Sequence, residues 1–319
     1  MAAATVAAGA VLDRSVKHGN TSAMPTVQAN GIDLYFDAFG PEDAPALLLV
    51  PGLGAHGVGY DDELCEAIVV AAGVRLLRYD NRDVGLSTHL DGAPADVLSA
   101  MTAALAGEPV DAPYTLSDMA ADGIGLLDAL GIDDCHVVGA SMGGMIAQTM
   151  AIEHPDRIRS LTSIMSTTGE RDVGAPDPDC LSGILSIMAP VGSREERIEQ
   201  GVGLARLIGT PSVFDEERAR ARSTLFVDRA DDPDGTARQM VAILAAGSCA
   251  EGLREVRVPT VVLHGDLDPL VDISGGRRTA ELVPGARIEV LDRMGHDLPP
   301  AYWDRVVGGV AAAVTAVDA

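Results

Sequence analysis

Apolar residues along this chain fall into short runs that alternate with longer amphipathic stretches. Buried-strand runs occupy residues 46–50, 75–79, 135–138, 161–165, 260–263 and 287–291, and most of them are continuous apolar runs, as expected for parallel strands covered on both faces. The stretches between them repeat with the period of a helix, at residues 61–72, 116–130, 142–153, 274–282 and 301–317. This alternation predicts an α/β fold with a mostly parallel sheet and right-handed crossovers.

Two regions depart from the alternation. Residues 27–35 alternate around Asn30-Gly31, which predicts a hairpin of two antiparallel edge strands. Residues 168–249 contain no strand pattern but three amphipathic stretches, at 194–208, 216–228 and 235–246. We interpret them as a helical lid inserted between two strands; the alternative is that these helices simply pack on the sheet.

The same pattern predicts the domain boundaries. The core comprises residues 25–167 and 250–319, and the insert comprises residues 168–249. Residues 1–24 lack periodicity and precede the hairpin, so we expect a disordered extension there.

Composition excludes several classes of function. The 319 residues are 47% hydrophobic and 22% charged, which fits a soluble globular protein, and no apolar stretch is long enough to cross a membrane. The net charge is −24 and no basic run occurs, so nucleic acid is a poor partner. Four scattered cysteines and the absence of metal-ligand motifs predict a cytoplasmic protein without metal or cofactor.

The strongest chemical signal is the motif Gly139-Ala140-Ser141-Met142-Gly143. It fits G-x-S-x-G, and it lies between the predicted strand 135–138 and the predicted helix 142–153. A sharp turn at this place exposes a serine hydroxyl beside the amino end of a helix. Ser141 is therefore the candidate nucleophile.

A serine nucleophile needs a base and an acid that orients the base. His296 is the candidate base, because it follows the last predicted strand, where catalytic groups of α/β sheets gather. Asp268 is the candidate acid, with Asp266 as its rival in the loop after strand 260–263. The order Ser141, Asp268, His296 is that of α/β-hydrolases.

Acyl chemistry also requires donors for the developing oxyanion. One candidate is the backbone N–H of Met142, directly after the serine. The other is the N–H of Leu53, in the sequence Pro51-Gly52-Leu53-Gly54 that follows strand 46–50. Apolar residues of the insert, such as Met188 and Leu207, are expected to line the acyl pocket.

Three stretches of the chain together resemble a known family. Residues 78–88 read RYDNRDVGLST, residues 138–148 read VGASMGGMIAQ and residues 294–299 read MGHDLP. From about residue 25 onward the chain resembles the α/β-hydrolase superfamily, in particular the aclacinomycin methylesterase-like and lipase G-type carboxylesterases. The resemblance implies an eight-stranded sheet with a helical lid, a triad of Ser141, Asp268 and His296, and a structural role for residues 80–88. Pro51 departs from the pattern, since many members have His there.

The resulting hypothesis is a cofactor-free serine carboxylesterase that cleaves small to medium neutral esters through an acyl-enzyme. Thioesterase, polyketide methylesterase, lysophospholipase and perhydrolase use the same apparatus and remain alternatives. An aspartate-nucleophile mechanism is disfavoured by Ser141. A ligand-binding receptor that turns nothing over is a different class of alternative, because a fold does not determine function.

Overall fold

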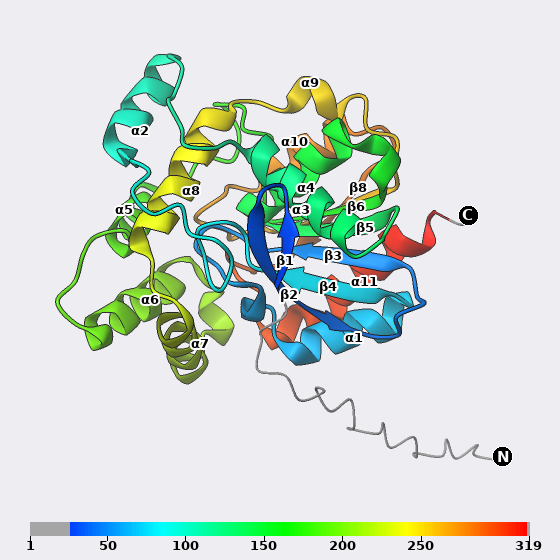
Figure 1. The fold of residues 1–319 in the computed structure, drawn as a ribbon, viewed down its shortest axis with the longest axis horizontal. Helices are drawn as coiled ribbons and strands as arrows, with labels where there is room; N and C mark the ends of the chain where they lie inside the picture. The colour runs from blue at the N-terminus through cyan, green and yellow to red at the C-terminus, as the bar shows by residue number, and fades with distance from the viewer. Residues whose placement is uncertain (1–25, 318–319) are drawn as a thin grey trace.

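The computed structural model describes residues 26–317, so the expectation for residues 1–24 lies outside the described residues. Its centre is an eight-stranded sheet in the order β1-β2-β4-β3-β5-β6-β7-β8 (Figure 1). β1 pairs with β2, and β2 with β4, in antiparallel fashion. The remaining neighbours in this order, from β4 through β3 and β5 to β8, pair in parallel. The strands are β1 Thr26–Ala29, β2 Ile32–Phe39, β3 Ala46–Val50, β4 Arg75–Tyr79, β5 Cys135–Ala140, β6 Ile158–Ile164, β7 Thr260–Gly265 and β8 Arg287–Leu291. The predicted fold class is confirmed.

Helices cover both faces of the sheet. On one face α1 (Asp62–Ala72) and α11 (Trp303–Thr315) pack on each other and on the strands (Figure 1). On the other face lie α3 (Leu116–Ala129), α4 (Met142–Glu153) and α10 (Ser274–Leu282). Every residue of β3 and of β7 is buried, which explains why the sequences of these strands are largely apolar rather than alternating.

Three α-helices of the described residues were not predicted by the pattern. These are α2 (Val97–Ala106), α5 (Pro178–Ile187) and α9 (Ala250–Leu253). In α2, Leu98 and Leu105 are 70% and 79% exposed, so its apolar residues do not gather on one buried face. Without such a face, the helical period is hard to recognise in a sequence.

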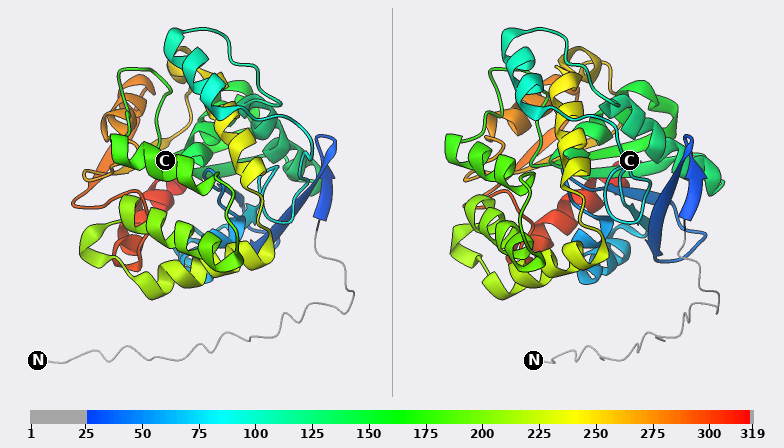
Figure 2. Two further views of the ribbon diagram at one scale, coloured as in Figure 1. Left: turned by 90° about the vertical axis from the view of Figure 1, so that its left-hand side faces the viewer. Right: turned by 60° about the vertical axis from the view of Figure 1, so that its left-hand side comes forward.

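Residues 168–249, between β6 and β7, form four α-helices: α5, α6 (Arg194–Ile208), α7 (Glu216–Arg229) and α8 (Pro233–Ala246). In Figure 2 they lie beside the sheet, at the end where the parallel strands finish. α6 packs on both α5 and α7, whereas α8 packs on α2 and α3 of the core. Within the described residues, no helix is long and apolar enough to cross a membrane.

Candidate active site

Ser141 lies at a tight turn between β5 and α4. Its backbone has φ 57° and ψ −123°, a region that side chains rarely adopt and that is associated with functional strain. The turn needs glycine on both sides. A Cβ on Gly139 would lie 2.0 Å from the carbonyl oxygen of Gly143, and a Cβ on Gly143 would lie 2.1 Å from the last carbonyl oxygen of β3. The G-x-S-x-G motif thus has the strand–turn–helix context that the sequence predicted.

His296 and Asp268 form a buried hydrogen-bonded pair. Nδ1 of His296 lies 2.8 Å from Oδ2 of Asp268, and both residues are 7% exposed. The backbone N–H groups of Leu270 and Val271 donate to Oδ1 of the same carboxylate at 2.9 and 2.8 Å.

The surroundings of Asp268 favour its ionised form. Burial alone would raise the pKa of Asp268. The charge of His296, hydrogen bonds from His264 and His296, and the Val271 amide outweigh burial and hold the pKa well below its usual range. A permanent negative charge therefore lies against Nδ1 of His296 at neutral pH.

Asp266 takes a different position in the same loop. Its exposed carboxylate accepts a hydrogen bond from the backbone N–H of Arg293 at 2.5 Å, in the turn after β8. The structure therefore brings Asp268, and not its rival Asp266, to His296.

The loop that carries His296 is held by the insert. The backbone N–H of His296 donates to the carbonyl of Ile208 at 2.7 Å, at the end of α6. The N–H of Gly295 donates to Oγ1 of Thr210 at 2.9 Å, and that hydroxyl donates to Asp297 at 2.5 Å. The position of the imidazole thus depends on a segment about 85 residues away in the chain.

The segment 51–54 lies directly beside the serine. A Cβ on Gly52 would be 3.9 Å from Oγ of Ser141. The segment turns back on itself, with the N–H of Ala55 donating to the carbonyl of Gly52 at 3.2 Å. Leu53 occupies the first central position of this turn. Met142 begins α4, so its N–H has no acceptor within the helix.

A cavity of about 920 Å³ lies over these residues. Ser141, His296, Leu53 and Met142 all line it, while Asp268 lies behind His296. The insert supplies most of the apolar wall: Leu181, Ile184, Ile187, Leu204, Ile208, Phe214, Phe226, Val227, Met240, Ile243 and Leu244.

Two apolar residues expected in this wall lie elsewhere. Met188 and Leu207 are not among the described residues that line the cavity. Leu207 packs against Gly183, where an added Cβ would lie 2.5 Å from its Cδ2. It therefore fills the contact between α5 and α6. The helical period alone does not say which of two neighbouring elements an apolar face meets.

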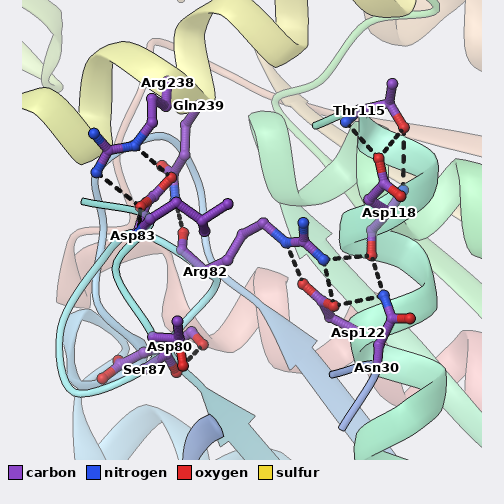
Figure 3. A network of polar contacts seen from close by, with 12 residues as sticks. Asn30, Asp80, Arg82, Asp83, Ser87, Thr115, Asp118, Asp122, Arg238 and Gln239 are labelled. Atoms are coloured by element: carbon purple, nitrogen blue, oxygen red, sulfur yellow. Dashed lines mark hydrogen bonds and ion pairs between the residues drawn. The ribbon is translucent and has the colours of Figure 1, made fainter. Parts of the chain in front are cut away.

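The loop after β4 carries a buried polar network, part of which Figure 3 shows. Asp83 forms two hydrogen bonds with Arg238 of α8 at 2.9 and 2.8 Å, and Arg82 forms two with Asp122 of α3, both at 2.6 Å. Asp80 accepts from the N–H of Gly57 at 2.7 Å. Residues 80–88 thus connect the loop after β3 with α3 and α8.

One group of metal-ligand side chains occurs among residues 26–317. Ligand atoms of Asp83, His89 and Asp232 lie within 4.8 Å of one another. Arg238 contacts both carboxylates, and Nδ1 of His89 lies 2.6 Å from Asp232. Each carboxylate already has a hydrogen-bonding partner among these side chains, so we assign the group to the polar network.

His56 follows β3, and its buried side chain lines the cavity. Its ring stacks on Phe226 of α7, with centroids 4.5 Å apart. Burial, followed by the positive charge of Arg229 and the proximity of His89, lowers the pKa of His56 to about 3. The imidazole is therefore neutral at physiological pH.

Comparisons with known proteins agree with this geometry. A family model described as the alpha/beta hydrolase fold matches residues 45–299. Rhodomycin D methylesterases of Streptomyces sp. strain C5 and Streptomyces peucetius are 29% and 30% identical over 313 residues, covering 91% of this chain and 98% of each relative. The enol-lactonase of Burkholderia xenovorans LB400 is similar in structure, with TM-score 0.69 and 24% identity over 91% of this chain and 100% of that one.

Proposed function

The chain belongs to the α/β-hydrolase fold family, and we propose that it is a serine carboxylesterase that works through an acyl-enzyme. The observation that supports this most is the Asp268–His296 pair beside a cavity that Ser141 lines from a strained backbone turn. The methylesterase and enol-lactonase relatives support ester cleavage as the reaction.

In the proposed mechanism, Oγ of Ser141 attacks the ester carbonyl and His296 accepts the hydroxyl proton. Asp268 keeps Nδ1 of His296 protonated and stabilises the imidazolium that forms. The N–H groups of Leu53 and Met142 stabilise the oxyanion. His296 then gives its proton to the leaving alkoxide, and the alcohol departs. Water, activated by the same imidazole, hydrolyses the acyl-enzyme and releases the acid.

We propose methyl esters of large, apolar acids as the substrate class, in place of the small to medium esters that the sequence suggested. The cavity of about 920 Å³ lies near the upper end of the usual range for ligand sites, roughly 300–1,000 Å³. A short acyl chain would leave most of the wall from α5 to α8 uncovered. The two methylesterase relatives support a methyl group as the alcohol part of the ester.

A panel of methyl esters tests this proposal. With acids that range from acetic acid to polycyclic aromatic acids, kcat/KM should rise with the size of the acid, because more of the apolar wall is covered. Comparing kcat/KM for the methyl ester and for a thioester of the same acid distinguishes an esterase from a thioesterase. A preference for acetyl esters over all larger acids would contradict the substrate class, and labelling of Ser141 by a serine-reactive probe without turnover of any ester would favour a receptor.

A further inference from the structure

Gln239 of α8 lies between two loops of the core, with its side chain fully buried. Its Oε1 accepts a hydrogen bond from the backbone N–H of Gly54 at 2.9 Å, and its Nε2 donates to the carbonyl of Arg82 at 2.8 Å. Figure 3 shows Gln239 extending from α8 beside Asp83 to Arg82. One side-chain amide thus joins the segment 51–54 to the loop after β4.

The segment 51–54 is held at both ends. At its start, the carbonyl of Pro51 accepts a hydrogen bond from Nδ2 of Asn81 at 3.0 Å. At its end, Gln239 binds Gly54, and Thr236 of α8 lies so close that a Cβ on Gly54 would be 3.0 Å from its Oγ1. Between these two anchors lies Leu53, whose N–H we propose as an oxyanion donor.

We propose that Gln239 is a positioning residue for the reaction. By holding the N–H of Gly54, it fixes segment 51–54 against Ser141 and keeps the N–H of Leu53 aimed at the developing oxyanion. This inference rests on the proposed serine esterase mechanism. Oxyanion stabilisation depends on donors that are in place before the charge develops, so a loosened segment stabilises the transition state less.

The effect of Gln239 on the reaction should have a specific kinetic form. Gln239 is not among the described residues that line the cavity, so it makes no contact with the substrate's ground state. An interaction that matters only in the transition state lowers kcat and kcat/KM together when it is lost, with KM unchanged. A residue that only stabilises the fold would lower melting temperature without this signature.

The test compares Gln239→Met with Gln148→Met. Gln148 of α4 is also fully buried, and its amide also bonds two partners, Ser163 and Cys249, away from segment 51–54. We expect kcat of Gln239→Met to fall about 10- to 100-fold with KM within about twofold, as for a small misplacement of a catalytic group. Gln148→Met should lose a similar amount of melting temperature and keep kcat within about twofold.

A second readout uses a trifluoromethyl ketone, which forms an oxyanion adduct with an active-site serine. Its affinity should fall by the same factor as kcat in Gln239→Met and stay unchanged in Gln148→Met. If Gln239→Met does not fold, Gln239→Asn, one methylene too short to bridge both loops, should show a smaller parallel loss.

The outcomes separate this inference from the proposed function. Turnover that survives in Ser141→Ala would refute the serine mechanism itself. If Ser141→Ala is inactive but the Gln239 variants keep kcat and ketone affinity at the level of their Gln148 counterparts, Gln239 is only a structural residue and the inference is wrong.

Discussion

At the scale of single residues, local sequence was enough to find the candidate groups of the site. Ser141, Asp268 and His296 each follow a strand in a loop with small or rigid neighbours, and such loops gather at one edge of a parallel sheet. The choice between Asp266 and Asp268 needed the structure, because both lie in one loop and only backbone direction decides which reaches His296.

Replacing the two aspartates separately tests the assigned acid. Asp268→Ala should lower kcat by about 10³- to 10⁴-fold, since the imidazole loses the charge that sets its tautomer. Asp266→Ala removes only a hydrogen bond to the Arg293 amide, so kcat should stay within about threefold. Steady-state kinetics with one methyl ester measures both. A larger loss for Asp266→Ala would reverse the assignment.

A second residue-scale prediction concerns stability at acidic pH. His56 has a normal pKa near 6.5 in the unfolded chain and a pKa of about 3 in the fold, where burial and then Arg229 disfavour its charged form. Its contribution to stability is therefore present above pH 6.5 and is lost as pH falls toward 3.

Urea unfolding at pH 7 and pH 5 measures this contribution. The free energy of unfolding of the natural protein should fall between these pH values by about 2 kcal/mol more than that of His56→Gln, which has no titrating group at this position. The comparison cancels the carboxylates that both proteins share. Identical losses in the two proteins would mean that His56 is not held neutral in the fold.

At the scale of elements, strands and long helices could be predicted, but their polar connections could not. The ranges 46–50, 75–79 and 287–291 match β3, β4 and β8; the first is a continuous apolar run, and the other two are short, mostly apolar runs that include charged residues. Asp83 and Arg238 are 155 residues apart, and nothing local in either segment signals their pairing. Such contacts depend on how distant elements meet in space.

The Asp83–Arg238 pair offers a prediction at this scale. Asp83 is fully buried and Arg238 is 2% exposed, so removing one partner takes from the other its two-bond ion pair; among residues 26–317, Arg238 then keeps only Asp232, at 3.2 Å. Asp83→Asn and Arg238→Met should each lower the free energy of unfolding by about 3–5 kcal/mol. The double variant should lose clearly less than the sum, because neither charge is then stranded. Strictly additive losses in denaturant unfolding would contradict this account of the connection between α8 and the loop after β4.

At the scale of the whole molecule, the alternation of strands and helices predicted an α/β fold with a mostly parallel sheet, and the resemblance of residues 78–88, 138–148 and 294–299 to a known family implied the α/β-hydrolase fold. The insert lies between β6 and β7, and the sequence predicted that its apolar residues line the pocket; its hydrogen bonds to the His296 loop and to segment 51–54 were not predicted. It contacts the site at two places: Ile208 and Thr210 hold the His296 loop, and Gln239 holds segment 51–54. We therefore propose that the insert both covers the cavity and helps to position the catalytic groups.

The central claim is that Ser141 carries a covalent acyl group during ester hydrolysis. It is tested most directly by acid quenching during turnover of a methyl ester, followed by peptide mass spectrometry. The account predicts an adduct with the mass of the acyl group on the peptide that contains Ser141, and neither adduct nor turnover in Ser141→Ala. Turnover by Ser141→Ala, or an acyl group on another residue, would contradict the account.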